Sequence, residues 1–200
     1  MKTAVFSDIH GNFDALEKVM SMIEKESPDK VIFLGDIFQK GNGEIECLDY
    51  LMNSDIITVK GNAELYIEHG VDIDPDVEYL REYYESMWNK LSNEQKNFIH
   101  NLPLTHVENI DGYRILFSHF LIRNINAAYP YFNISDMKKE CFSEAVKSHD
   151  FDEYDMVAVG HTHTDFETGK LRGVSSTGIV KPEFMLIETG KELTCRYITE

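Results

Sequence analysis

Side chains that commonly bind metal ions recur at the ends of apolar runs in this sequence. Asp8 and His10 follow the run AVFS, Asp36 follows VIFLG, and His161 and His163 follow MVAVG. The two members of each pair are two positions apart, so they can project toward the same side of an extended segment. Carboxylates and imidazoles suit Mn, Fe, Zn or Co, and the chemistry that such ions support is metal-assisted hydrolysis.

Two further runs end in the same way, because Asn62 follows IITVKG and His119 follows RILFS. Taken singly each group is a weak signal, since an Asp after a strand is more often a helix cap and an Asn more often a turn residue. Ligands of open α/β sheets gather beyond the carboxyl ends of the strands, so the whole series is expected to converge in one crevice. The candidate metal ligands are Asp8, His10, Asp36, Asn62, His119, His161 and His163.

The elements that must position these groups alternate between apolar runs and amphipathic stretches, which predicts an α/β protein with a largely parallel central sheet. Residues 64–101 read as helical, with a capping box at Ser92 and Gln95. The expected strands are 3–6, 31–34, 56–59, 113–117 and 156–159, and the expected helices are 13–25 and 45–52. The tail from Leu171 is expected to form antiparallel strands at 173–180, 183–189 and 192–199.

Composition limits the class of partner and the compartment. The chain has 19 Lys and Arg against 35 Asp and Glu, a formal net charge of −16. Such a field repels nucleic-acid backbones, so DNA or RNA binding is disfavoured. No apolar run approaches the roughly 20 residues of a membrane span, and the N-terminus lacks a signal-peptide pattern. Three widely spaced cysteines, Cys47, Cys141 and Cys195, indicate reduced thiols and a cytoplasmic protein.

The segments SDIHGN, GDIFQKG, GNAE, SHF and GHTHTDF resemble the successive motifs of the calcineurin-like metallophosphoesterase superfamily. The nearest likeness is to small prokaryotic members, which include phosphodiesterases and diadenosine polyphosphate hydrolases. The resemblance implies an α/β fold of two packed mixed β-sheets flanked by helices. We expect one domain over residues 1–200, with a cap-like helical insertion at about 64–102.

The resemblance also implies a binuclear metal centre with Asp36 as the bridging ligand. Mn is the favoured metal, with Fe, Zn, Co and Ni as alternatives. By position, one ion would take Asp8, His10, Asp36 and His163, and the other would take Asp36, Asn62, His119 and His161.

The implied activity is hydrolysis of phosphodiester or phosphoanhydride bonds by a metal-bridged hydroxide, with Asp36, Asn62 and His119 as catalytic residues. The expected partner is a small-molecule phosphate such as a nucleotide or dinucleotide polyphosphate. The sequence leaves both a monomer and a homo-oligomer open. One alternative is a broad phosphomonoesterase or protein phosphatase. It is disfavoured because the positions where protein phosphatases carry arginines beside the motifs are Phe13, Gln39 and Ala63. The other alternative is a non-catalytic metal-binding scaffold.

The sequence departs from the family pattern at Ala63, where the family has a histidine that is thought to protonate the leaving group. Alanine cannot donate a proton, which predicts a preference for leaving groups that are already stable anions. Glu64 could supply the proton instead, although an acid at a helix start is the simpler interpretation.

Substrate contacts are expected from residues next to His119. Arginine suits phosphate oxygens and an aromatic face suits a base. The simpler alternative is that the aromatic residues only cover the sheet. The candidates are Phe120, Arg123, Asn124 and Tyr129.

Overall fold

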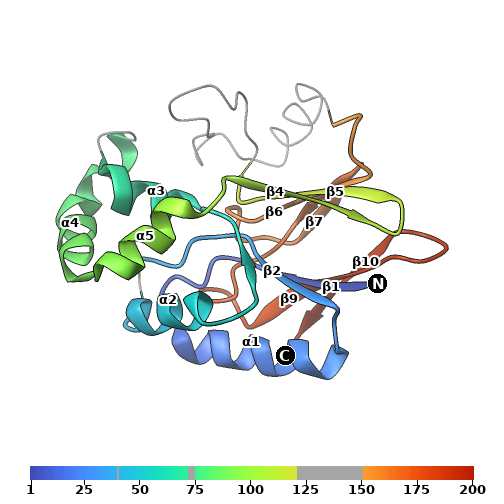
Figure 1. The fold of residues 1–200 in the computed structure, drawn as a ribbon, viewed down its shortest axis with the longest axis horizontal. Coiled ribbons are helices and arrows are strands. Elements are labelled where there is room, and N and C mark those ends of the chain that lie inside the picture. Colours follow the sequence, from blue (N-terminus) through green and yellow to red (C-terminus); the bar gives the residue numbers. More distant parts are fainter. Residues whose placement is uncertain (40, 72–74, 121–150) are drawn as a thin grey trace.

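The protein is described by a computed structural model that covers residues 1–39, 41–71, 75–120 and 151–200. One five-stranded mixed sheet has the order β10-β9-β1-β2-β3, with β1, β2 and β3 parallel and β9 and β10 antiparallel to their neighbours (Figure 1). Its strands are β1 (Lys2–Phe6), β2 (Lys30–Phe33), β3 (Ile57–Thr58), β9 (Glu183–Glu188) and β10 (Thr194–Thr199).

The second five-stranded sheet has the order β4-β5-β6-β8-β7 and is also mixed. Its inner strands β5, β6 and β8 are parallel, and the edge strands β4 and β7 run antiparallel to their neighbours. The strands are β4 (Thr105–Ile110), β5 (Tyr113–Ser118), β6 (Met156–Val159), β7 (Phe166–Thr168) and β8 (Leu171–Gly173). Two mixed sheets flanked by helices confirm the expected fold class.

Helices lie beside and at one end of the first sheet (Figure 1). They are α1 (Phe13–Glu26), α2 (Glu44–Met52), α3 (Asn62–His69), α4 (Arg81–Lys90) and α5 (Asn93–Asn101), with the 3-10 helix η2 (Pro75–Leu80) before α4. The capping box of α5 is confirmed: Gln95 N donates to Ser92 Oγ at 3.2 Å, and Ser92 N donates to Gln95 Oε1 at 2.9 Å. The helices from α3 to α5 occupy the region in which a helical insertion was expected.

The core has separate layers on the two faces of the first sheet. Ala4 and Phe6 of β1 pack with residues of α1 and α2, whereas Val5 packs between the sheets against Phe117 and Ala158. Because successive side chains of a strand point to opposite faces, a strand that is buried on both faces is apolar throughout. This explains why β6 and the C-terminal parts of β1 and β2 are continuous apolar runs in the sequence.

Two expectations for the strands are wrong. Residues 173–180 do not form an antiparallel strand: β8 ends at Gly173 and pairs parallel with β6, and a loop follows. The loop is held by hydrogen bonds to the end of β1, because Thr177 N donates to Ser7 O and Gly178 N donates to Asp8 O. In addition, β4 and β7 are absent from the expected set of strands.

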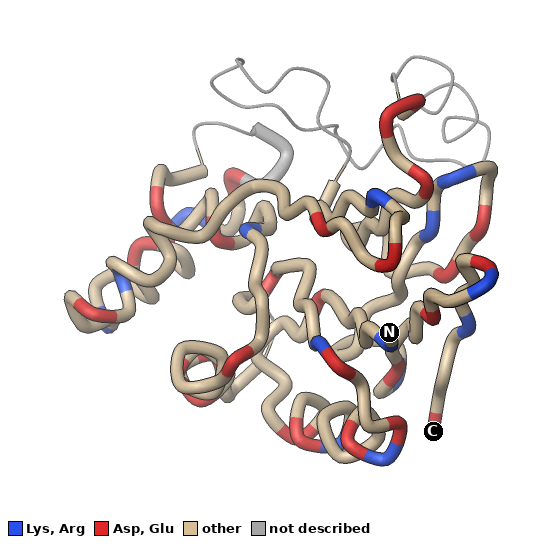
Figure 2. Tube along the Cα trace, turned by 45° about the vertical axis from the view of Figure 1, so that its right-hand side comes forward, with Lys and Arg blue, Asp and Glu red and all other residues tan. Residues whose placement is uncertain are grey.

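Acidic residues are spread over helices and loops, with basic residues scattered among them (Figure 2). In the part of the chain that the structure describes, no helix combines the length and the hydrophobicity needed to cross a membrane.

Candidate metal centre

The seven candidate ligands meet beyond the carboxyl ends of parallel strands, as expected from their place in the sequence. Six of them are buried, and the seventh, His163, has a side chain that is 30% exposed. Asp8 and His10 follow β1, Asp36 follows β2, Asn62 opens α3 after β3, His119 follows β5, and His161 and His163 follow β6.

These side chains form two adjoining groups. The first contains Asp8, His10 and His163, and the second contains Asp36, His119 and His161; within each group the ligand atoms lie within 4.8 Å of one another. Asp36 Oδ2 lies between the groups, 3.4 Å from His119 Nε2 and 3.9 Å from His10 Nε2. This grouping matches the division into two ion sites that the resemblance implies.

Backbone carbonyls fix the tautomers of two of these histidines. His10 Nδ1 donates to Phe38 O at 2.8 Å, and His119 Nδ1 donates to Leu34 O at 2.9 Å. In a neutral imidazole whose Nδ1 carries the proton, Nε2 is an acceptor with a lone pair. Both Nε2 lone pairs are therefore available to a metal ion, which is the usual arrangement behind a ligating histidine.

The acceptor atoms face one another without enough donors between them. His10 Nε2 lies 3.1 Å from His163 Nε2, and His119 Nε2 lies 2.9 Å from Asn62 Oδ1 and 3.2 Å from His161 Nδ1. Among the described residues, His161 Nε2 is buried and has no hydrogen-bond partner. Converging lone pairs repel one another unless a cation, either a proton or a metal ion, lies between them, so this donor set fits metal ions.

The electrostatics of the site also favour positive charge. Burial opposes ionisation of the Asp8 and Asp36 carboxylates, but His119 and the neighbouring imidazoles outweigh it. They hold the pKa of Asp8 well below its ordinary value and lower the pKa of Asp36 as well. Burial likewise opposes protonation of His119, yet Asp36 and Asp8 raise its pKa to about 9. Burial and the neighbouring His119 lower the pKa of His161 to about 4. Both carboxylates are thus ionised acceptors.

Close backbone approach shapes the second group. Gly35 has a φ of +100°, and a Cβ there would lie 2.5 Å from Gly61 N. A Cβ on Gly61 would in turn collide with Asp36 Oδ1. Glycine at both positions therefore lets the turn after β2 and the start of α3 pack directly against each other, which brings Asp36 beside Asn62.

Glu64 joins the same two segments. Its carboxylate is 0% exposed and accepts hydrogen bonds from the backbone N–H groups of Asp36 at 2.9 Å, Ile37 at 2.8 Å and Gly61 at 2.8 Å. With these three donors the side chain holds the turn of Asp36 against α3. The structure therefore supports the role of an acid at a helix start rather than that of a proton donor.

The expected substrate contacts have mixed outcomes. Phe120 is 1% exposed, and its ring lies edge-on to His119 and His161 at centroid distances of 5.6 and 6.0 Å. It packs against imidazoles of the candidate metal centre, and a contact with substrate stays a prediction. Arg123, Asn124 and Tyr129 lie outside the described residues, as does Cys141.

Sequence reasoning missed the residues that support the ligands from outside. Ser7 Oγ donates to Asp8 Oδ2, and Ser176 Oγ donates to the backbone oxygen of Asp8 at 2.8 Å. Tyr83 of α4 hydrogen bonds to the loop after β2. Only Ser7 had a local signal, its place next to Asp8 in a motif; the others lie far from the ligands in the sequence.

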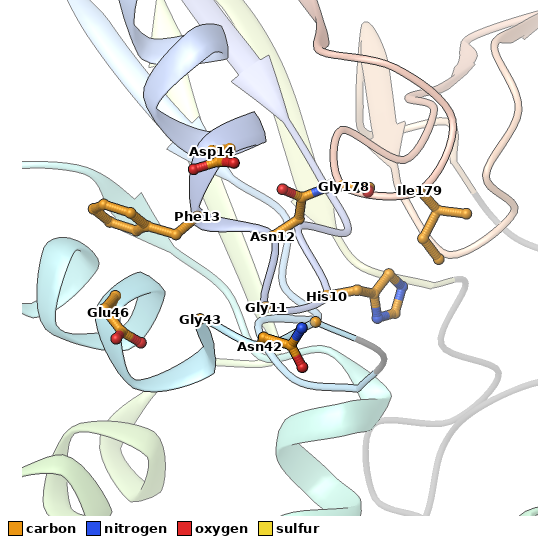
Figure 3. Close-up of a pocket in the computed structure, with 11 residues that line it drawn as sticks. His10, Gly11, Asn12, Phe13, Asp14, Asn42, Gly43, Glu46, Gly178 and Ile179 are labelled. Carbon is orange, nitrogen blue, oxygen red and sulfur yellow. Dashed lines mark hydrogen bonds between the residues drawn. The ribbon is translucent and has the colours of Figure 1, made fainter.

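A cavity of about 480 Å³ adjoins the candidate metal centre at His10 (Figure 3). Phe13 and Glu46 lie toward one end of it, and His10, Asn42 and Ile179 toward the other. Of the candidate ligands only His10 lines this space, so the cavity lies beside the centre and not over it.

Residues 1–182 match the sequence pattern of the calcineurin-like phosphoesterase superfamily domain. The chain belongs to this superfamily. Among curated superfamily relatives, an uncharacterised protein of Methanocaldococcus jannaschii is 31% identical over 167 residues, which are 82% of this chain and 63% of that protein. A symmetrical bis(5'-nucleosyl)-tetraphosphatase of Actinobacillus succinogenes is 34% identical over 70 residues, 34% of this chain and 26% of that protein. The matches thus span less than two thirds of either relative.

Solved structures share the calcineurin-like phosphoesterase fold at low sequence identity. A protein of Pyrococcus horikoshii OT3 is similar with a TM-score of 0.77 and 20% identity, covering 99% of this chain and 87% of the other. A metallophosphoesterase from Sphaerobacter thermophilus has a TM-score of 0.67 and 20% identity, covering 99% and 88%. The architecture of these proteins is therefore that of the present chain.

Proposed function

We propose that this protein hydrolyses phosphodiester or phosphoanhydride bonds in nucleotide-type substrates, using two metal ions held by the seven candidate ligands. The observation that carries the proposal is the pair of adjoining buried groups, with Asp36 between them and acceptor atoms facing one another. When bound, such ions supply positive charge for phosphate oxygens and activate water near neutral pH. The mixed oxygen and nitrogen donor set suits Mn, Fe, Zn and Co, and manganese is the ion that we propose to test first.

The residues of the chain contribute binding and orientation. Asp8 and Asp36 supply negative charge, and the carbonyls behind His10 and His119 keep the Nε2 lone pairs directed into the centre. Asp36, Asn62 and His119 are the proposed catalytic residues: Asp36 lies between the two groups, and Asn62 Oδ1 lies 2.9 Å from His119 Nε2. In this proposal no serine or cysteine acts as a nucleophile.

The choice of leaving group follows from Ala63 and Glu64. Ala63 is 0% exposed, and its backbone N donates to Asp36 Oδ1 at 2.8 Å, so the residue offers no side-chain proton donor. Burial and the charge of Asp36 raise the pKa of Glu64, against three backbone hydrogen bonds that lower it. Both carboxylate oxygens accept from backbone N–H groups, so neither points a proton toward a leaving group. Without a general acid at these positions, substrates with stable anionic leaving groups are favoured, as in phosphoanhydrides.

The cavity beside His10 is the proposed site for the organic part of the substrate. Its volume falls in the range of small-molecule sites, and Asn42 and the Phe13 ring offer hydrogen bonds and an apolar face. One relative is a symmetrical bis(5'-nucleosyl)-tetraphosphatase, which favours a dinucleotide polyphosphate as the substrate to test first.

Two alternatives are weaker. A scaffold without bound metal has no physical reason to keep two ionised carboxylates and four imidazoles converging in a buried site, because burying them is costly without cations. A metal-binding scaffold is distinguished from an enzyme by the hydrolysis assay below. A protein phosphatase is disfavoured because Gln39 and Ala63 replace the arginines that such enzymes carry, and because Phe13 packs edge-on to Tyr50.

The test uses Mn-loaded and metal-stripped protein with dinucleotide polyphosphates, an aryl phosphodiester and an alkyl phosphodiester. We expect hydrolysis only with metal, and aryl substrates to exceed alkyl substrates by about 10²–10⁴-fold because no general acid is present. Asp36→Asn is expected to abolish nearly all turnover. Asp55→Asn makes the same chemical change at an exposed position outside the centre and is expected to leave turnover intact.

Full activity of the Asp36→Asn variant, or equal turnover with and without metal, would overturn the proposed site. Equal rates for aryl and alkyl leaving groups would remove the argument from Ala63 while leaving the metal centre in place.

A further inference from the structure

Tyr83 of α4 contacts the loop that leads from β2 to α2. Its hydroxyl accepts a hydrogen bond from Gln39 N at 2.8 Å and donates one to Glu44 Oε1 at 2.9 Å. Glu44 is the first residue of α2 and is 6% exposed. Because the phenol both accepts and donates, the direction of its O–H bond is fixed.

The Gln39 N–H belongs to the same planar peptide group as the Phe38 carbonyl. That carbonyl accepts the hydrogen bond from His10 Nδ1 at 2.8 Å. One peptide group is therefore held at its oxygen by His10 and at its nitrogen by Tyr83. Gln39 has a φ of 84°, a left-handed conformation that costs a residue with a side chain on the order of 1–3 kcal/mol and persists only when its surroundings hold it.

Three hydrogen bonds link His10 to Glu44 in series, and all three donate in the same direction. His10 donates to the Phe38–Gln39 peptide, the peptide donates to Tyr83, and Tyr83 donates to the Glu44 carboxylate. Hydrogen bonds linked in this way polarise one another. The negative charge on Glu44 therefore makes the Tyr83 oxygen a stronger acceptor, and this in turn makes the Phe38 carbonyl a stronger acceptor. The result is greater electron density on the His10 ring.

Glu44 also touches the backbone next to His10. A Cβ built on Gly11 would lie 2.6 Å from Glu44 Cγ, and Gly43 N donates to Gly11 O at 2.9 Å. The side chain that ends the hydrogen-bonded chain thus packs directly against the residue that follows His10. The start of α2 and the end of β1 are held together at this point.

We infer that Glu44 and Tyr83 are positioning residues that orient His10 and strengthen it as a ligand for the ion of the Asp8–His10–His163 group. A carboxylate behind a ligating histidine fixes its tautomer and raises its basicity. Here a phenol and a peptide extend that arrangement. The inference rests on the proposed function, since it requires His10 to bind metal. It also gives α4 a part in supporting the centre.

The first test measures metal affinity. Tyr83→Phe keeps the ring and removes both hydrogen bonds, so calorimetric titration of metal-stripped protein with Mn should show about tenfold weaker binding of one ion. Binding of the other ion should change little. Tyr84→Phe is the matched control, because this neighbour in α4 is buried and its hydroxyl has no hydrogen-bond partner among the described residues. It should leave both affinities unchanged.

The second test reads the His10 tautomer by ¹⁵N NMR of the imidazole in metal-free protein. It is made at a pH at which the ring is neutral, because Asp8 and Asp36 outweigh burial and raise the pKa of His10. We expect a fixed Nδ1–H tautomer in the wild type and in Tyr84→Phe, and a mixture of tautomers in Tyr83→Phe. Glu44→Gln keeps an acceptor for Tyr83 but removes the charge. It should therefore keep the His10 tautomer and weaken binding of the same ion. This variant also serves if Tyr83→Phe does not fold.

The outcomes separate the inference from the proposed function. Two outcomes in a wild type that binds two ions would overturn the inference. In the first, Tyr83→Phe leaves both affinities and the tautomer unchanged. In the second, it weakens the binding of both ions equally. If the wild type binds no Mn, the proposed function fails, whereas the tautomer measurement still shows whether Tyr83 orients His10.

Discussion

Backbone strain is concentrated at the candidate ligands. Asp8, His10, Asp36, His161 and His163 all have φ between 48° and 66°. Residues with side chains rarely adopt this left-handed region, although Asp, Asn and His adopt it more readily than most. Each such residue costs on the order of 1–3 kcal/mol and must be held by its surroundings. At the scale of single residues, the hydrogen bonds behind the ligands therefore matter as much as the ligands.

Glu64 provides the sharpest prediction at this scale. Glu64→Gln leaves one acceptor oxygen and places an NH₂ group against backbone donors, so at least one buried N–H loses its partner. Hydrogen bonds to a charged group contribute about 1.5–3 kcal/mol, and an unsatisfied buried donor costs a similar amount. We expect the free energy of unfolding to fall by about 2–4 kcal/mol. Urea unfolding of the metal-free variant measures this change.

Glu94→Gln is the control for this substitution. Glu94 also lies in the first turn of a helix, α5, but it is exposed. Its replacement should cost no more than about 0.3–1 kcal/mol, the usual interaction of an acid with a helix start. Equal losses for the two variants would show that Glu64 acts only through the helix dipole and does not clamp the turn of Asp36.

At the scale of elements, the sequence predicts the buried parallel strands well. The run MVAV was expected at 156–159, and β6 spans Met156–Val159. Such strands are apolar on both faces, which a single sequence displays directly. The edge strands β4 and β7 contain THVENI and FET, which lack a continuous apolar run. The available signal for β4 was the Asp111–Gly112 pair, whose positive φ values suit a two-residue hairpin turn.

The loop after β8 shows why other parts could not be predicted. Its residues favour a strand locally, but Ser176 Oγ donates to Asp8 O at 2.8 Å and accepts from Ile179 N at 3.1 Å. The contact with Asp8 joins residues 168 positions apart in the sequence. The contacts of Glu64 and Tyr83 likewise join distant segments. The sequence motifs contain the ligands, but the residues that hold the ligands in place can be identified only from the folded structure.

A prediction at this scale concerns Ser176→Ala. The residue is 0% exposed. Removing its hydroxyl takes away the acceptor of Ile179 N and one of the two hydrogen bonds to Asp8 O, which keeps the bond from Gly178 N. We expect a loss of about 1–3 kcal/mol in the free energy of unfolding. Denaturant unfolding measures it, with Ser21→Ala on the exposed surface of α1 as the control that should change little. A neutral Ser176→Ala variant would mean that the loop does not depend on this contact.

At the scale of the whole molecule, metal binding and folding stability are coupled. The chain carries a net charge of −16, and two bound divalent ions would offset part of it where two carboxylates are buried together. A ligand that binds only the folded state stabilises it by about 2.7 kcal/mol at a concentration one hundred times its Kd. We therefore expect the Tm of metal-stripped protein to rise with Mn concentration in scanning calorimetry.

Asp36→Asn separates this effect from general screening of charge. The variant should show a much smaller rise in Tm with Mn, whereas Asp55→Asn should behave as the wild type does. If all three proteins gain the same Tm, Mn acts through the surface and not through the candidate centre.

The central claim is that seven side chains from distant segments hold two ions on either side of Asp36. Anomalous X-ray diffraction from crystals of the Mn-loaded protein tests this claim most directly. We predict two anomalous peaks roughly 3.5–4 Å apart, one beside Asp8, His10 and His163 and the other beside Asn62, His119 and His161. A single peak, or peaks away from Asp36, would contradict it.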